Sequence, residues 1–252
     1  ELFFARALAS RPDWAEAAYN RGLMLMQLNR LDEALQSLDR AVQLQPDYAA
    51  ALSSRGMLLA AAGHSDRAMQ SYDAAIASKG DFVEAHNNRA ALLKQLGREE
   101  EALAAYDRAI ALRADLPELH YNRGTVLFDL RRLEDAVAAH RTAISLRPDY
   151  TDAQYNLGVT LAELERFEEA LHAYDAALAL RPFDANIINN RGATLSALQR
   201  PDEALAAFDQ ALAMVPTFVE ALNNRAGVLR EFGRIDEAIG CVEQALAIAP
   251  DN

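Results

Sequence analysis

The chain has 252 residues, of which 51% are hydrophobic, and its formal net charge at pH 7 is −12. The apolar content is ample for folded structure, and the negative charge argues against a nucleic-acid partner. The single cysteine, Cys241, excludes an intrachain disulfide, and no segment reads as a signal peptide or as a membrane span.

A 34-residue period runs along the whole chain. Residues 1–14 correspond to the second helix of a unit whose first helix is missing, and seven full units follow. Their ranges are 15–48, 49–82, 83–116, 117–150, 151–184, 185–218 and 219–252. A unit of this size cannot bury its own apolar face, so neighbouring units must stack.

The residue pattern of each unit predicts two helices joined by a turn. With repeat position 1 set at Ala15, apolar residues at helical spacing predict a first helix over positions 2–14. Position 15 is Gly or Asn in four units, which suits a left-handed helix end. The second helix is expected over positions 18–31, before a proline that occupies position 32 in five units. Fourteen helices and one helix in residues 1–14 are therefore expected, with no strand.

Small residues recur where two helices must approach closely. Position 8 is always Gly or Ala, and positions 20 and 27 are always Ala. Position 24 is usually large, as in Tyr72, Tyr174 and Phe208. The pattern resembles the tetratricopeptide repeat family over the whole chain, except that position 4 lacks the family's aromatic residue. The resemblance implies an all-α fold, a right-handed superhelix (α-solenoid) of seven repeats plus an N-terminal half repeat. It also implies a concave groove lined by the first helices.

Amide side chains dominate the expected groove. Position 6 is Asn in six units: Asn20, Asn88, Asn122, Asn156, Asn190 and Asn224. An amide can pair with both the C=O and the N–H of a peptide, and the row is similar to the Asn ladder in the repeat domains of protein O-linked N-acetylglucosamine transferases. The other candidate partner-binding residues are Tyr19, Asn87, Tyr121, Phe128, Tyr155, Asn189 and Asn223. Two alternatives stay open: the asparagines bond neighbouring repeat backbones, or the position-5 and position-12 residues are ordinary half-exposed helix residues.

Acidic residues at position 2 have two interpretations. They form an acidic rail that favours basic peptides, or they belong to capping boxes such as Asp13-x-x-Glu16 and Asp81-x-x-Glu84. The capping interpretation is the stronger one. Either way, acids at this position argue against binding of the acidic C-terminal tails of chaperones, which the family's clamp-type domains bind with Lys or Arg.

Charged residues at two other positions predict ion pairs between repeats. Position 7 is Arg in six units and position 25 is acidic in six. The exceptions, Arg141 at position 25 and Leu157 at position 7, fall in successive units. If position 25 of one unit pairs with position 7 of the next, the two exceptions fall at the same junction. That junction loses both the acid and the arginine, and all other junctions keep both. We therefore predict partly buried pairs that set the register of stacking.

No catalytic, cofactor or metal motif is found. Eight of the eleven glycines occupy positions 8 or 15, which leaves no phosphate-binding loop, and the five histidines do not form a zinc set. We expect a cytoplasmic, non-enzymatic scaffold without a cofactor, whose partner is a protein or peptide. Two further hypotheses are the substrate-recruiting arm of a larger enzyme, such as an O-linked glycosyltransferase, and self-association end to end. Both ends of the sequence fall within the repeat pattern, so we expect a piece of a longer protein.

Overall fold

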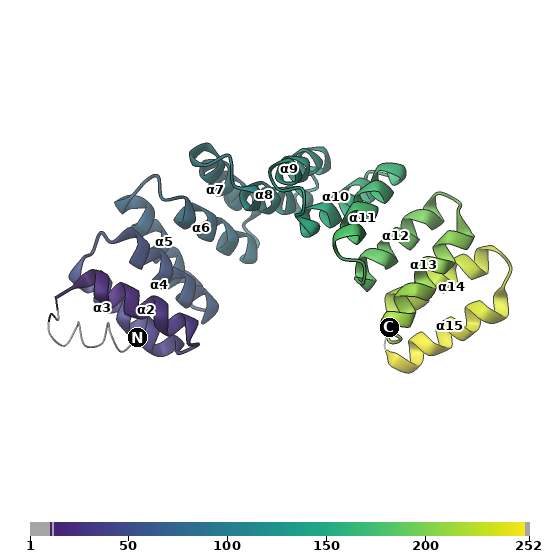
Figure 1. The fold of residues 1–252 in the computed structure, drawn as a ribbon, viewed down its shortest axis with the longest axis horizontal. Helices are drawn as coiled ribbons and strands as arrows, with labels where there is room; N and C mark the ends of the chain where they lie inside the picture. The colour runs from purple at the N-terminus through teal and green to yellow at the C-terminus, as the bar shows by residue number, and fades with distance from the viewer. Residues whose placement is uncertain (1–10, 12, 250–252) are drawn as a thin grey trace. The chain divides into compact units, whose positions relative to one another are not determined.

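The computed structural model describes residue 11 and residues 13–249. These residues form fourteen α-helices and no strand (Figure 1). The all-α prediction is confirmed. The helix predicted in residues 1–14 lies almost wholly outside the described residues.

The helices alternate strictly between the two types that the sequence predicts. The first helices of the units are α2 (Ala15–Gln27), α4 (Ala49–Ala61), α6 (Val83–Gln95), α8 (Pro117–Asp129), α10 (Thr151–Glu163), α12 (Ala185–Ala197) and α14 (Val219–Glu231). The second helices are α3 (Leu31–Leu44), α5 (Ser65–Ser78), α7 (Glu99–Leu112), α9 (Leu133–Leu146), α11 (Phe167–Leu180), α13 (Pro201–Met214) and α15 (Ile235–Ile248). Both types begin one residue earlier than predicted.

The chain divides into two compact units, residues 1–126 and residues 127–252. In the first unit the helix pairs α2–α3, α4–α5 and α6–α7 pack internally, and α4 also contacts α6. In the second unit α9 packs on α10, the pairs α10–α11, α12–α13 and α14–α15 pack internally, and α12 contacts both α10 and α14. In each unit, first helices therefore lie beside first helices and present a shared face.

The close approach of the two helices in a repeat depends on glycine at position 8. A Cβ atom added to Gly158 would lie 2.6 Å from Cε1 of Tyr174, and one added to Gly192 would lie 2.7 Å from Cε1 of Phe208. The two aromatic side chains are 2% and 1% exposed. The expected pairing of small position 8 with large position 24 is confirmed, and it fixes how each hairpin closes.

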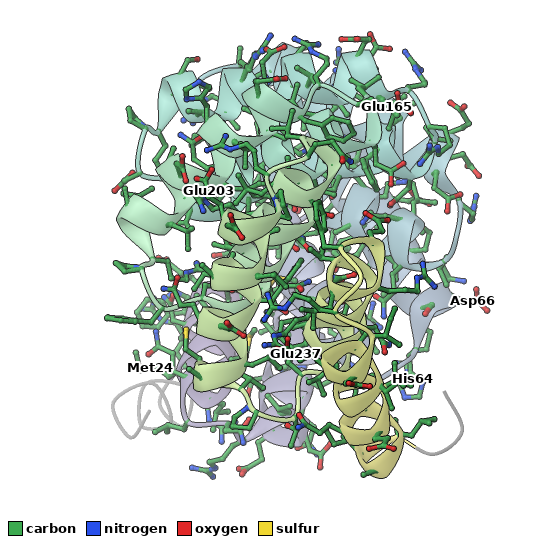
Figure 2. All side chains as sticks on the ribbon, turned by 90° about the vertical axis from the view of Figure 1, so that its right-hand side faces the viewer. Met24, His64, Asp66, Glu165, Glu203 and Glu237 are labelled. Atoms are coloured by element: carbon green, nitrogen blue, oxygen red, sulfur yellow. The ribbon has the colours of Figure 1, made fainter. Side chains whose placement is uncertain are left out.

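The turn between the helices of a repeat uses a left-handed residue in every repeat. The backbone φ at position 15 is positive at Asn29, Gly63, Gly97, Arg131, Glu165, Gln199 and Gly233. Three of these residues, Arg131, Glu165 and Gln199, have side chains that disfavour this conformation. Glu165 is exposed, and Figure 2 labels it at the surface of the molecule. At these three turns the geometry is thus imposed by the repeat and not by local preference.

Replacing Gln199 by Gly is expected to raise the free energy of unfolding by about 1 kcal/mol, because glycine has no Cβ to strain at a φ of 58°. The measurement is urea unfolding followed by circular dichroism. The matched control is Gln210→Gly, in the middle of α13, which should lower the stability by about 1 kcal/mol. A loss of stability in both variants would contradict the assignment of strain to this turn.

The capping-box prediction is wrong, because it requires the N-cap at repeat position 33 and the helices begin one residue later. The structure places the N-cap at repeat position 34, as at Trp14, Phe82 and Phe218, and these residues make no side-chain capping hydrogen bond. Asp184 is the exception among the described caps at this position, because its carboxylate accepts hydrogen bonds from the backbone N–H groups of Asn186 and Ile187. The position-2 acids are consequently available for other contacts.

Candidate functional site

The predicted asparagines lie on the first helices of both units and are half-buried. The first unit carries Asn20 on α2, Asn88 on α6 and Asn122 on α8, and the second carries Asn156 on α10, Asn190 on α12 and Asn224 on α14. They share one repeat position, so in each unit they follow one another along the face that the first helices form together.

In the first unit the amides are linked by hydrogen bonds. Asn122 Nδ2 donates to Asn87 Oδ1 at 3.3 Å. Asn87 Nδ2 donates in turn to Asn88 Oδ1 at 3.3 Å. Asn88 Nδ2 donates to the Ser53 hydroxyl at 3.4 Å. The direction is the same at each junction: position 6 donates to position 5 of the preceding repeat.

The second unit repeats this arrangement. Asn224 Nδ2 donates to Asn189 Oδ1 at 3.0 Å. Asn189 Nδ2 donates to Asn190 Oδ1 at 3.4 Å and to Glu220 Oε1 at 3.1 Å. Asn190 Nδ2 donates to the Tyr155 hydroxyl at 2.8 Å. We call each of these two chains an amide relay: Asn122–Asn87–Asn88–Ser53 in the first unit and Asn224–Asn189–Asn190–Tyr155 in the second.

The relays bear on the two interpretations of the asparagines. Their hydrogen bonds join neighbouring repeats through side chains and not through backbone groups. An Asn amide has two N–H donors and one acceptor oxygen. One N–H of the amide donates to the preceding repeat in each of four residues: Asn88, Asn122, Asn190 and Asn224. The second N–H keeps a defined direction, since the first fixes the amide plane.

The remaining candidates differ in exposure. Asn189 is 1% exposed, so it can hold its neighbours but cannot reach a ligand, whereas Asn223 is exposed. Phe128 is half-buried on α8, and Tyr121 is half-buried on the same helix. Tyr19 packs against the ring of Tyr48, with 5.1 Å between ring centroids, and is partly a core residue.

Tyr155 lies where a relay meets the core. Its ring centroid is 6.1 Å from that of Tyr174, and its hydroxyl receives the Asn190 amide proton. Burial, reinforced by the Glu220 carboxylate, raises the pKa of Tyr155. The phenol is therefore neutral at physiological pH and keeps its own O–H as a donor.

The predicted ion pairs between repeats are present at all five matched junctions. The N–O distances are Arg55–Asp39 2.6 Å, Arg89–Asp73 2.7 Å, Arg123–Asp107 2.6 Å, Arg191–Asp175 2.6 Å and Arg225–Asp209 2.7 Å. At the mismatch, Arg141 binds Glu169 instead, at 2.7 Å. The arginines are half-buried and the carboxylates more exposed, so the position-7 arginines serve the stacking of repeats.

A double-mutant cycle on Asp175 and Arg191 should give a coupling energy of about 0.5 kcal/mol, because the Asp175 side chain is 53% exposed and water screens the pair. The cycle compares urea unfolding of Asp175→Ala, Arg191→Ala and the double variant. Strict additivity of the two single effects would show that the pair contributes only geometry and no stability.

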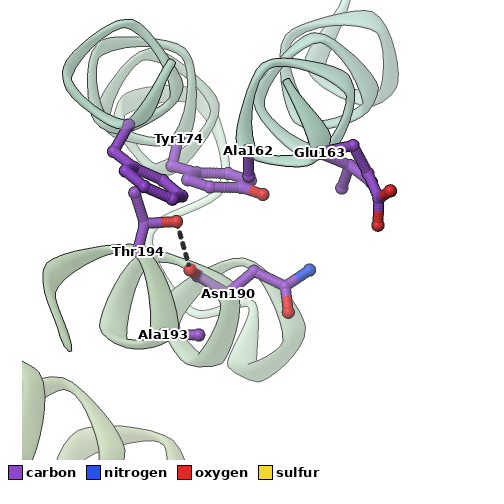
Figure 3. Close-up of a pocket in the computed structure, with 8 residues that line it drawn as sticks. Ala162, Glu163, Tyr174, Asn190, Ala193 and Thr194 are labelled. Carbon is purple, nitrogen blue, oxygen red and sulfur yellow. Dashed lines mark hydrogen bonds between the residues drawn. The ribbon is translucent and has the colours of Figure 1, made fainter. Parts of the chain in front are cut away.

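A pocket of about 270 Å³ opens on the same face of the second unit, between α10, α11 and α12 (Figure 3). Its lining residues are Val159, Ala162, Glu163, Phe167, Tyr174, Asn190, Ala193 and Thr194. The Thr194 hydroxyl donates to the backbone carbonyl of Asn190 at 2.9 Å, and Asn190 itself lines the pocket. Asn190 of the second amide relay thus borders a pocket large enough for one side chain.

The outer face of α15 exposes apolar side chains. Ile235, Ile239, Val242 and Leu246 are each between 43% and 50% exposed. Such a surface accords with the expectation of self-association, which stays a prediction.

The described part of the chain contains neither a candidate metal site nor a candidate membrane-spanning helix. No group of three or more His, Cys, Asp or Glu side chains there could hold a metal ion. No helix there is long and apolar enough to cross a bilayer.

Repeated helix pairs whose first helices share a polar, hydrogen-bonded face define the chain as a helical-repeat protein. Family models agree with the geometry. A tetratricopeptide repeat model matches residues 121–185 and 190–252, just over half of the chain. A TPR repeat model matches residues 92–131, and a further tetratricopeptide repeat model matches residues 15–48. The chain belongs to the tetratricopeptide repeat family.

Solved structures share the fold at low sequence identity. YrrB, described as a TPR protein with an unusual peptide-binding site, is 24% identical with a TM-score of 0.65, over 73% of this chain and 95% of that one. PilF of Pseudomonas aeruginosa is 18% identical with a TM-score of 0.73, over 87% and 96% of the two chains. MamA of Desulfovibrio magneticus RS-1 is 19% identical with a TM-score of 0.64, over 68% and 96%. No curated protein matches the sequence.

Proposed function

We propose that this chain is a protein-interaction scaffold that binds an extended polypeptide along the face of its first helices, with the amide relays as the backbone-reading element. The observation that carries the proposal is the recurrence of one hydrogen-bonding pattern in both units, with an Asn-Asn pair at its centre. The solved neighbour YrrB, described as having a peptide-binding site, supports the same class of function.

The relays supply pre-organised donors. In each relay the position-6 amide is fixed by the repeat before it, so a ligand carbonyl meets an N–H that already points in one direction. Binding then loses little side-chain entropy, which is the main cost of ordering long polar residues at an interface. Asn122 and Asn224 also keep Oδ1 as an acceptor, because their described side-chain hydrogen bonds use only Nδ2.

The amide relays also limit which parts of a ligand the chain can recognise. Side-chain amides that pair with backbone C=O and N–H groups carry no information about the ligand's side chains. The partner should therefore be an extended segment, and its sequence should be selected elsewhere on the face. An enzyme's recruiting arm would use this groove in the same way, and it stays a hypothesis about a longer protein.

Changing Asn88, Asn122, Asn156 and Asn190 together to Ala should reduce binding to a random peptide array at least about tenfold, because each lost charge-neutral hydrogen bond contributes about 0.5–1.5 kcal/mol. The matched control removes four exposed amides from the second helices: Gln36, Gln70, Gln210 and Gln244 to Ala. It should leave binding unchanged.

Thermal unfolding of both variants separates binding from stability. Equal binding by the wild type and the asparagine variant would show that the relays serve only the stacking of repeats. A loss of binding in the glutamine variant as well would show that the array detects non-specific adhesion. Either result would remove the groove as the proposed site.

A further inference from the structure

We propose that the pocket between α10, α11 and α12 receives a lysine or arginine side chain of the bound polypeptide, so that the preferred partner is a basic extended segment. This inference rests on the proposed function and adds side-chain selectivity to it. Three features of the pocket support it: its apolar walls, the Tyr174 hydroxyl at its border and its negative charge.

The walls are apolar and made of small or flat side chains. Val159 and Ala162 come from α10, Phe167 from the start of α11, and Ala193 from α12. An aliphatic stem can lie along such walls while its polar end stays at the rim, as Lys and Arg side chains do on apolar surfaces. A pocket of about 270 Å³ has room for a long unbranched side chain.

The Tyr174 hydroxyl borders the pocket. The residue as a whole is 2% exposed, yet its phenolic oxygen does not belong to the buried side-chain atoms of the described residues that lack a hydrogen-bond partner. Figure 3 shows its ring across the pocket with the hydroxyl beside Ala162. A phenolic oxygen accepts hydrogen bonds, so the N–H group of a ligand side chain that enters the pocket can donate to it.

The pocket carries one charged side chain, and it is negative. Glu163 lines the rim and is 43% exposed. Arg131 donates to its Oε2 at 2.9 Å, but that arginine is 64% exposed and the pair is weak. This bond uses Oε2 of Glu163, which leaves Oε1 towards the pocket rim as a further acceptor, and the net charge of −12 attracts cations to the whole chain. Charge complementarity therefore selects a basic side chain over a neutral one of the same length.

The walls of this pocket differ from the same positions in other repeats. Here position 12 is small, Ala162, and position 17 is aromatic, Phe167. In the third repeat the same positions are Lys94 and Glu99, whose long side chains and opposite charges do not build such walls. No other repeat combines Ala at position 12 with an aromatic residue at position 17.

The test uses fluorescent Gly/Ser-rich host peptides with one central guest residue: Lys, Arg, norleucine or Glu. Norleucine matches the lysine stem without its charge. The wild-type chain should bind the Lys and Arg hosts about tenfold more tightly than the norleucine host, and the Glu host most weakly, as measured by fluorescence anisotropy.

Three variants assign the selectivity. Glu163→Gln should reduce the preference for Lys over norleucine to about twofold, and Ala162→Leu should abolish it by filling the pocket. Glu165→Gln, an exposed carboxylate two residues away, should leave the preference intact. Circular dichroism confirms that each variant is folded.

The outcomes distinguish failure of the basic-side-chain pocket from failure of the proposed scaffold function. Equal binding of the Lys and norleucine hosts, with binding still lost in the asparagine variant, would overturn the basic-side-chain pocket and leave the scaffold proposal standing. A preference that persists in Ala162→Leu would also overturn the pocket. Binding of no host at all would remove both proposals.

Discussion

Replacing Phe208 by Ala is expected to lower the free energy of unfolding by about 3–5 kcal/mol. The side chain is 1% exposed and packs in one cluster with Leu195, Leu205 and Leu229. Its ring also fills the space above Gly192, where even a methyl group would lie 2.7 Å away. Truncation therefore leaves a cavity that the close-packed helices of the sixth repeat cannot collapse into without losing other contacts.

The matched control is Phe183→Ala, which removes the same side chain from a position that is 83% exposed. It should change the stability by less than about 0.5 kcal/mol. Urea unfolding by circular dichroism measures both. Similar losses in the two variants would contradict the assignment of the core, and a small loss in Phe208→Ala would show that the hairpin repacks.

Acidification from pH 7 to pH 5 should lower the stability of the chain by about 2 kcal/mol through one residue, His140. Burial lowers the pKa of His140 from 6.5 to about 4. The unfolded chain therefore takes up the proton first, and stability falls as the pH drops from about 6.5 towards 4. Below pH 4 both states are protonated and this loss levels off at about 3 kcal/mol.

His140→Phe should remove this part of the acid sensitivity, because Phe208 occupies the same repeat position in the sixth repeat. The measurement is the difference between urea unfolding free energies at pH 7 and pH 5 for the variant and the wild type. His172→Gln, which removes an exposed histidine, should keep the full difference. An unchanged pH dependence in His140→Phe would show that the buried ring does not titrate in this range.

Features that recur in every repeat were predictable from the sequence. The ion pairs are the clearest example, because the joint loss at Arg141 and Leu157 fixes which repeat supplies each partner. The pairing of Gly158 with Tyr174 follows in the same way from small and large positions that never change places. Such inferences need only the period, since each repeat serves as a test of the others.

Features that depend on side-chain direction were not predictable. The sequence gives no sign that Asn88 would donate to Ser53, because a serine at position 5 looks like a departure from the Asn and Tyr of other repeats. The sequence favours capping as the role of the position-2 acids, yet Glu220 at that position accepts a hydrogen bond from Asn189, because α14 begins one residue later than a capping box requires. The pocket beside Asn190 depends on Phe167, which falls outside the groove positions that the family resemblance supplies.

The most direct test of backbone reading is to measure the affinity of one peptide that binds the chain against two altered forms of it. One form has its side-chain sequence scrambled with the same composition, and the other carries N-methyl groups at alternate backbone nitrogens. If the chain reads the peptide backbone, scrambling should change the affinity by less than about threefold, apart from the effect of moving a basic residue, and N-methylation should weaken it at least about tenfold. Loss of binding on scrambling with full retention on N-methylation would contradict the account.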